Sequence, residues 1–119
     1  MARKTINELV AEFADSIVKQ NEAFLRRDIE TANAFADRYV DAFRELRDIG
    51  NPGLTALASL FDHERPDVRT TAAAFLIPYM TEESVRVLEE AAEGRGIVAL
   101  GAEMALKRWR EEKKGVEVD

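Results

Sequence analysis

The stretch that decides the fold is Val68-Arg69-Thr70-Thr71-Ala72-Ala73-Ala74-Phe75-Leu76-Ile77-Pro78-Tyr79. Its large and small apolar residues fall at offsets 0, 4, 7, 8 and 11, which is the spacing of one helical face. The same offsets recur in Phe35, Tyr39, Ala42, Phe43 and Leu46, and in Val98, Ala102, Ala105, Leu106 and Trp109. The steps between the sets are 33 and 30 residues. Any amphipathic helix produces such offsets, but the matched order and the similar steps favour a helical repeat.

Capping residues and glycines place the first helices. Thr5 with Glu8 three residues later forms a capping-box pattern, which predicts a helix from Ile6 to about Arg26. Asp28 is an N-cap residue type and predicts a second helix that ends at Ile49, where Gly50 can take a positive φ.

Prolines, a threonine and a glycine pair divide the rest of the chain. Asn51 is expected to cap a third helix with Pro52 as its first residue, and Pro66 to open a fourth that Pro78 stops. The remaining expectations are a helix capped by Thr81, a break at Gly94-Arg95-Gly96, and a last helix from Ile97 to about Glu112.

No window alternates with the period of a strand over more than a few residues, so the predicted class is all-α. We expect about six helices, arranged as three antiparallel hairpins stacked into a short right-handed α-α superhelix. A single domain is expected over residues 1–119, with 1–4 and 115–119 frayed. Its predicted continuous core consists of Phe13, Phe35, Phe43, Leu57, Phe61, Val68, Phe75, Leu76 and Leu106.

Composition excludes several classes of protein. The chain has 119 residues, no cysteine, 46% hydrophobic residues and a formal net charge of −6. A disulfide scaffold and a cysteine zinc site are therefore excluded. The longest uncharged runs, residues 49–61 and 70–81, have 13 and 12 residues, which is shorter than the ~18 that a spanning helix needs. The early charges also interrupt any signal-peptide core, so we expect a cytoplasmic protein without membrane partners.

The turn at 62–67 and the start of the following helix resemble a HEAT-type repeat. The matching residues are Asp62-His63-Glu64-Arg65-Pro66-Asp67 and Val68-Arg69-x-x-Ala72-Ala73. The resemblance implies that Arg69 pairs with Asp62 or a nearby acid. The whole pattern is similar to a small bacterial domain family of unknown function with a HEAT-like fold, through Ala32-Asn33, residues 45–50 and residues 102–109.

Residues for catalysis are few. The one histidine, His63, has only Ser59 nearby in sequence and no third partner, so no catalytic residue and no enzyme activity are expected. Arg65 and Arg69 interleave with Asp62, Glu64 and Asp67, which argues against a metal site. Gly94-Arg95-Gly96 fits a dinucleotide fingerprint formally, but an acidic helical segment precedes it where a strand is needed. No cofactor is expected; an anion at the start of the last helix is an alternative.

We therefore expect a protein-interaction module, an adaptor or a neutralising, immunity-type partner of another protein. The expected footprint, on the second helix of each pair, consists of Tyr79, Arg108, Trp109, Arg38 and Glu45. Asp41 and Thr70 are expected on the same side. Lys107, Arg108, Arg110, Lys113 and Lys114 make nucleic acid an alternative partner, but interspersed glutamates and the net charge of −6 disfavour it. The sequence leaves a homodimer open.

Overall fold

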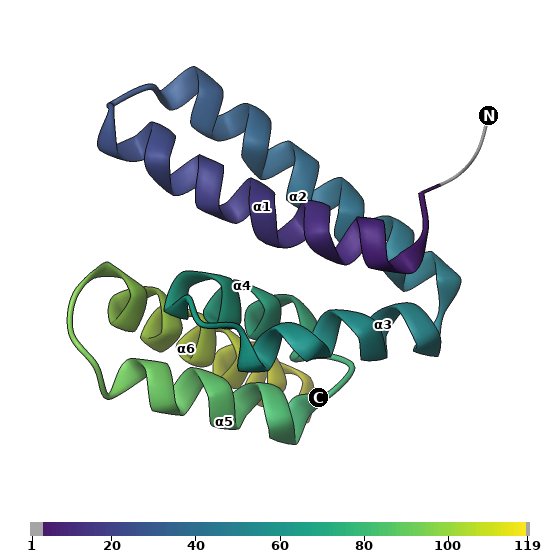
Figure 1. Cartoon of the computed structure of the whole chain (residues 1–119). Coiled ribbons are helices and arrows are strands. Elements are labelled where there is room, and N and C mark those ends of the chain that lie inside the picture. Colours follow the sequence, from purple (N-terminus) through teal and green to yellow (C-terminus); the bar gives the residue numbers. More distant parts are fainter. Residues whose placement is uncertain (1–3, 119) are drawn as a thin grey trace. The chain divides into compact units, whose positions relative to one another are not determined.

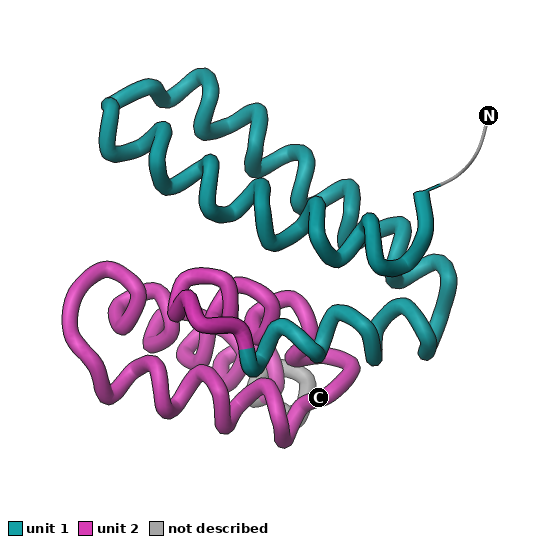
Figure 2. Tube along the Cα trace, viewed as in Figure 1, with its two compact units in different colours: residues 1–62 teal, residues 63–119 magenta. Residues whose placement is uncertain are grey.

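The computed structural model describes the backbone of residues 4–118 and the side chains of residues 4–113. Within that range every regular element is a helix, which confirms the all-α prediction. The elements are α1 (Ile6–Leu25), α2 (Ile29–Ile49), α3 (Asn51–Ala58), the 3₁₀ helix η1 (Ser59–Asp62), α4 (Pro66–Leu76), α5 (Thr81–Ala92) and α6 (Ile97–Val118) (Figure 1). They form two compact units, Met1–Asp62 and His63–Asp119 (Figure 2).

Unit 1 is built on the antiparallel pair α1 and α2, and α3 packs against both (Figure 1). The predicted capping box is confirmed: the Glu8 N–H donates to Thr5 Oγ1 at 3.1 Å, and the Thr5 N–H donates to Glu8 Oε1 at 3.0 Å. The bond from the Thr5 backbone lowers the pKa of Glu8. Asp28 caps α2 as predicted, and hydrogen bonding by the side chain and backbone of Thr31 lowers the pKa of Asp28.

The core of unit 1 follows the helical spacing of its sequence. The buried apolar residues of the α1–α2 pair are Leu9, Phe13, Ile17, Ala23, Ala32, Ala42, Phe43 and Leu46. Phe13 meets Tyr39 edge-on, with ring centroids 5.6 Å apart. Two of the predicted core residues of this unit, Phe35 and Phe61, are only half-buried. Phe35 lies under two cations, with Lys19 Nζ 5.7 Å and the Arg38 guanidinium carbon 5.1 Å from its ring centroid.

The connection from α2 to α3 is one residue long. Gly50 has φ +101°, as its predicted role requires, and its carbonyl accepts from the Gly53 and Leu54 N–H groups. The predicted cap is wrong by one position: Gly50 is the N-cap, and Asn51 is the first residue of α3. The positive φ reverses the chain within a single residue, so the helix starts before Asn51 can act as a cap.

Unit 2 places α4 against both α5 and α6, and α5 packs along α6. Pro66 opens α4 and the helix ends at Leu76, before Pro78, as predicted. The buried apolar residues of unit 2 are Val68, Ala72, Ala73, Leu76, Ile77, Leu88, Ala99, Ala102 and Leu106. Phe75, predicted to be buried, is only half-buried.

Two helix boundaries in unit 2 differ from the prediction. Met80 rather than Thr81 occupies the N-cap position of α5, and it makes no side-chain cap bond. Thr81 is the first residue of the helix, and its hydroxyl donates to the Ile77 carbonyl at 2.8 Å. α6 continues to Val118 instead of ending near Glu112, so residues 115–118 are helical and not frayed. The fraying expected at 1–3 and 119 lies outside the described residues.

Candidate functional site

One side of α6 carries large apolar side chains that the fold leaves uncovered. Ile97, Leu100 and Met104 are 88%, 56% and 56% exposed. Their spacing of 0, 3 and 7 places them on one face, hereafter the α6 stripe. The buried residues Ala99, Ala102 and Leu106 have the same spacing two residues later. Two residues correspond to about 200° around a helix, so the stripe faces away from the side of α6 that packs in unit 2.

Gly101 lies within the α6 stripe, beside Leu100 and one turn from Ile97. A Cβ built on Gly101 would meet no atom within 4 Å. Neither packing within the described structure nor a positive φ therefore requires glycine at this position. Glycine inside a helix costs about 0.5–1 kcal/mol relative to alanine, so the stripe carries a small residue that unit 2 itself does not need.

A groove with two adjoining sections follows the seam between α5 and α6. One section, of about 530 Å³, has Ala92 and Leu106 among its lining residues, and the other, of about 500 Å³, has Val85 and Trp109. Both sections share Glu89 and Arg110, whose Oε2 and Nη2 atoms are 3.5 Å apart. The Glu89–Arg110 ion pair therefore marks the place where the two sections meet.

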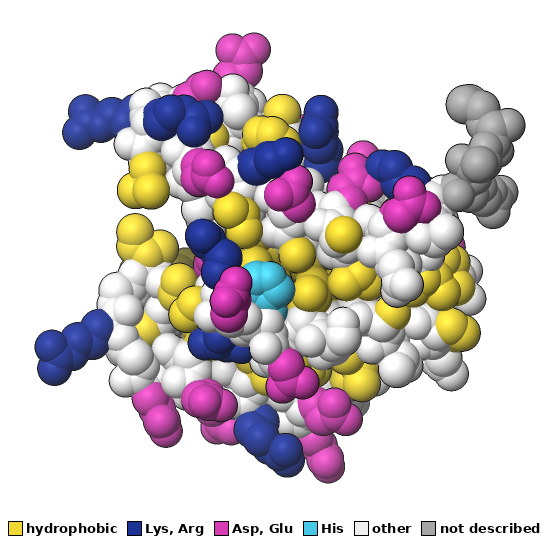
Figure 3. Space-filling view, viewed as in Figure 1, with side chains coloured by type: hydrophobic (Ala, Val, Ile, Leu, Met, Phe, Trp, Pro, Cys, Tyr) yellow, Lys and Arg dark blue, Asp and Glu magenta, His cyan; other side chains and the backbone are white. Residues whose placement is uncertain are grey.

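The two groove sections differ in charge. Glu93, Glu103 and Glu111 line the first section together with Lys107. Arg86, Lys113 and Glu82 line the second, beside Trp109. On the face of the molecule drawn in Figure 3, Lys and Arg side chains are likewise interspersed with Asp and Glu, and hydrophobic side chains reach the surface between them.

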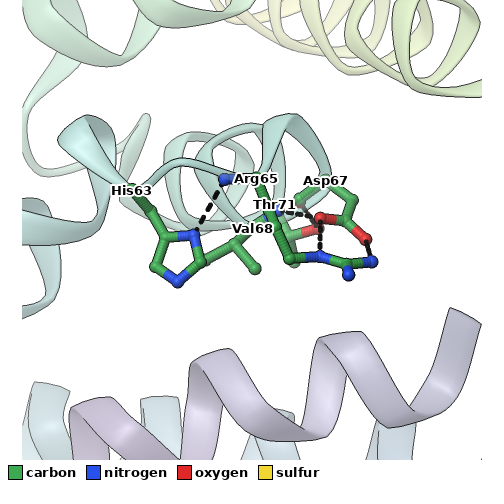
Figure 4. A network of polar contacts seen from close by, with 5 residues as sticks. All are labelled: His63, Arg65, Asp67, Val68 and Thr71. Atoms are coloured by element: carbon green, nitrogen blue, oxygen red, sulfur yellow. Dashed lines mark hydrogen bonds and ion pairs between the residues drawn. The ribbon is translucent and has the colours of Figure 1, made fainter.

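The turn before α4 is held by a polar network within unit 2 (Figure 4). Arg65 binds Asp67 through two contacts, Nε to Oδ1 at 3.1 Å and Nη2 to Oδ2 at 2.8 Å. The Arg65 N–H donates to His63 Nδ1 at 3.0 Å, and the Thr71 hydroxyl donates to the Asp67 carbonyl at 2.8 Å. The Asp67 carboxylate thus holds the Arg65 side chain, and its carbonyl accepts a bond from within the first turns of α4.

The expected ion pair of Arg69 is wrong. Arg69 Nη1 instead donates to the carbonyl oxygen of His63 at 2.6 Å, and Arg65 is the arginine that pairs with an acid. The physical reason is local: Asp67 is two residues from Arg65, and a bidentate contact with Arg65 occupies both of its carboxylate oxygens.

The expected footprint residues of unit 2 point in different directions. Arg108 is exposed and continues the α6 stripe, four residues after Met104. Trp109 is half-buried in the second groove section, which Arg108 does not line. Tyr79 is 48% exposed and lies in the turn three residues beyond the end of α4. Trp109 lies well inside α6, whereas Tyr79 lies beyond the end of α4, so the two residues do not occupy equivalent places in their helices.

The other footprint residues are on unit 1, apart from Thr70. Arg38 and Glu45 are exposed on α2, and Arg38 stacks on Phe35 as described above. Asp41 is exposed too, with Oδ1 3.6 Å from Arg44 Nη1. Thr70, expected at the surface, is buried, because α4 is covered by α5 on one side and α6 on another.

Ile97, Leu100 and Met104 are surface residues that were not predicted from the sequence. The sequence did contain a signal for this surface. In α6, the apolar residues Ile97, Leu100 and Met104 alternate with a second apolar set, Ala99, Ala102 and Leu106, two residues further along. A helix that is covered along one side can bury only one of these sets. A second exposed apolar group, Phe24, Leu25 and Ile29, lies at the α1–α2 turn of unit 1.

The residues considered for catalysis have local structural partners. The Ser59 hydroxyl donates to the Ala56 carbonyl at 2.6 Å, and His63 Nδ1 accepts from the Arg65 N–H. Across the described residues, no cluster of three His, Cys, Asp or Glu side chains has the geometry of a metal site. In the same part of the chain, no helix is both long and apolar enough to cross a membrane.

Comparisons with known proteins identify related chains. The family model described as a domain of unknown function, DUF2019, matches residues 7–109. The crystal structure of the protein RPA1889 from Rhodopseudomonas palustris CGA009 is similar, with a TM-score of 0.86 and 27% sequence identity. This similarity covers 92% of this chain and 91% of that chain. No curated protein matches the sequence.

Proposed function

The chain belongs to the DUF2019 family, a domain of unknown function, and from that premise we propose that it is a protein–protein interaction module. The proposed binding surface is the α6 stripe together with Arg108. Such a module acts as an adaptor or as a neutralising, immunity-type partner of another protein. The proposal contains no catalytic step.

The exposed apolar area of the α6 stripe is the observation that carries this proposal. Single exposed apolar residues are common on protein surfaces, whereas apolar residues that adjoin one another mark interaction sites. Ile97, Leu100 and Met104 adjoin one another along two turns of one helix. Arginine is enriched among the residues that dominate binding energy. Arg108 is exposed and lies one helical turn after Met104, on the same side of α6 as the three apolar residues.

Two finer features belong to the same proposal. We propose that the chain is a HEAT-like repeat protein, because the equivalent positions Val68, Ala72 and Leu76 of α4 are buried, as are Ala102 and Leu106 of α6. Trp109 and Tyr79 are proposed as accessory contacts, because each exposes part of an aromatic ring system with a polar atom.

Nucleic acid is a weaker candidate partner than protein. A phosphate-binding face needs cations that no acid neutralises, but Arg110 pairs with Glu89 and Lys107 lines a groove section with three additional glutamates, Glu93, Glu103 and Glu111. Lys114 lies outside the residues whose side chains are described. Retention on heparin at ~0.1 M salt, absent if this argument holds, distinguishes the two classes.

A small anionic ligand is the second candidate, and the second groove section supports it. Trp109 lies there with Arg86, Arg110 and Lys113, in a volume of about 500 Å³. Trp109 is the only tryptophan of the chain, so its fluorescence reports on this groove section alone. Titration with pyrophosphate would change the emission of Trp109 if this candidate is right and leave it unchanged if it is wrong.

Site-specific photo-crosslinking tests the proposed function. A photoreactive benzoylphenylalanine is placed at Leu100 or Met104 in the native host, and covalent adducts are identified by mass spectrometry. The matched control is the same group at Leu25, which is 87% exposed on unit 1. The proposal predicts one heterologous protein attached through both α6 positions and not through Leu25. Equal adducts from all three positions, or none from α6, would contradict it.

A further inference from the structure

Unpaired cations bracket the α6 stripe. Arg95 comes two residues before Ile97, and Arg108 follows Met104 by one helical turn. Both are exposed, and among the described residues neither of them forms an ion pair or a hydrogen bond. By contrast, the next arginine, Arg110, is paired with Glu89.

The start of α6 adds to the positive potential at this surface. The first turn of α6 contains no acidic residue, whereas α5 has Glu82 and Glu83 and α4 has Asp67 there. An uncompensated helix N-terminus carries about half a positive charge. Glu103 and Glu111 line the α5–α6 groove, and Glu112 follows Arg108 by one helical turn. Among the described residues neither Arg95 nor Arg108 is paired with an acid, so the apolar stripe has an exposed, unpaired arginine near each end.

This charge pattern disfavours a second copy of the chain as the occupant. In an antiparallel pairing of two α6 helices centred near Leu100 and Gly101, Arg95 of each copy would lie near Arg108 of the other. A parallel pairing would place each cation beside its own equivalent. Like charges that face one another across an interface oppose association, so both pairings are repulsive at their ends.

We propose that the α6 stripe binds one amphipathic helix of another protein, with apolar residues facing Ile97, Leu100 and Met104 and acidic residues just beyond both ends. This inference rests on the proposed function and names the chemistry of the partner. The stretch from Ile97 to Arg108 is about 16 Å long at 1.5 Å per residue, which suits a partner helix of three to four turns. Helix recognition through anchors spaced in this way is a common binding mode.

Gly101 supports a helix as the occupant. Its missing side chain lowers the surface between Leu100 and Met104, and a Cβ there would point into open space. Small residues allow helix backbones to approach closely. A partner helix that crosses α6 at Gly101 would therefore explain a glycine that the described structure does not otherwise require.

Peptide binding measured by fluorescence anisotropy on the full chain tests this inference. The first probe is a labelled helical peptide of about 18 residues, with leucines at spacings of 0, 3 and 7 and two glutamates beyond each end. The second probe is identical except that lysines replace the glutamates. We expect the chain to bind the glutamate peptide at least about tenfold more tightly, with an affinity that falls as salt is raised.

Charge reversal provides the decisive comparison. The double variant Arg95→Glu with Arg108→Glu should invert the preference, so that the lysine peptide binds more tightly. The matched control, Arg26→Glu with Arg44→Glu on unit 1, changes the net charge equally and should keep the original preference. Equal affinity for the two peptides, no binding of either, or inversion by the control would overturn the inference.

The failures of the two proposals are distinguishable. If crosslinking through Leu100 captures a heterologous protein but the peptides show no charge preference, the interaction function stands and the acidic-helix partner is wrong. If sedimentation shows a dimer that Leu100→Glu dissociates, the occupant is a second copy and the inference is wrong. If neither crosslinks nor peptide binding occur, both proposals are wrong.

Discussion

Ile97 and Met104 lie two helical turns apart on the same exposed side of α6, with 88% and 56% of their surfaces accessible. Gly101 lies between them, and no atom within 4 Å would contact a Cβ at that position. The arrangement costs the monomer stability twice, through exposed apolar surface and through a glycine in a helix interior. Binding of a partner would offset both costs, which leads to a prediction for Gly101.

Gly101→Ala should raise the free energy of unfolding by about 0.5–1 kcal/mol, because alanine restricts the unfolded chain and meets no obstacle in the fold. The same change should weaken partner binding, because the new methyl group stands on the proposed interface. Urea denaturation measures the first effect and anisotropy with the glutamate peptide the second. A stabilised variant that binds as well as the original chain would show that no helix approaches closely at Gly101.

Leu76→Ala should destabilise the chain by about 2–5 kcal/mol, through lost transfer free energy and the cavity left behind. Leu76 is completely buried in unit 2, as its position in the repeat pattern predicted. Total stabilities are about 5–15 kcal/mol, so the loss should be visible as a large shift in the thermal midpoint. A loss below about 1 kcal/mol would mean that Leu76 is not a principal core residue.

Gly53→Ala should also destabilise, for a different reason. A Cβ at Gly53 of α3 would stand 2.1 Å from the carbonyl oxygen of Leu46 in α2, and a backbone atom cannot move away cheaply. We expect a loss of about 1–3 kcal/mol, as for other overpacked positions. The paired measurement is informative, because the identical substitution at Gly101 should have the opposite sign. Equal effects at the two positions would contradict the packing described for α2 and α3.

Asp28 should make stability depend on pH. Because the folded state lowers its pKa through hydrogen bonds from Thr31, the contribution of Asp28 is complete above the unfolded pKa, near 3.8. It is lost as pH falls through the lower folded value. Asp28→Asn keeps a capping oxygen but has no carboxyl group to titrate. The variant should therefore lose less stability than the original chain between pH 5 and pH 2.

Denaturation at a series of pH values checks this expectation. The control is Asp37→Asn, which removes an exposed carboxylate in the middle of α2 that caps no helix. A pH dependence of Asp28→Asn that matches the original chain would show that the cap contributes nothing to acid sensitivity.

The helices were predictable because their ends depend on neighbouring residues. Thr5 with Glu8, Asp28 and Pro66 act within one turn of the helix that they start. The errors at Asn51 and Thr81 are of one residue. Gly50, with its positive φ, takes the N-cap position of α3, and Met80 takes that of α5. The positions of helix ends can therefore be predicted from neighbouring residues in the sequence to within about one residue.

The candidate surface was harder to predict, because it depends on which side of each helix the others cover. Thr70 looks like a surface residue from sequence, yet α5 and α6 enclose α4 and bury it. Leu100 and Met104 look like core residues, yet α6 packs through Ala99, Ala102 and Leu106. Arg108 was predictable as exposed because it lies off the repeat pattern that marks the buried side.

The most direct test of the central claim is the affinity of a crosslinked and identified partner for a double variant of the stripe. Leu100→Glu with Met104→Glu removes the apolar surface, and both positions are more than half exposed, so helicity by circular dichroism should be unchanged. The matched control is Leu25→Glu with Ile29→Glu on the exposed turn of unit 1. We predict that the α6 variant weakens binding at least about 100-fold, as loss of a hot spot does, while the control binds normally. Unchanged affinity of the α6 variant, or an equal loss in the control, would contradict the assignment of α6 as the partner-binding surface.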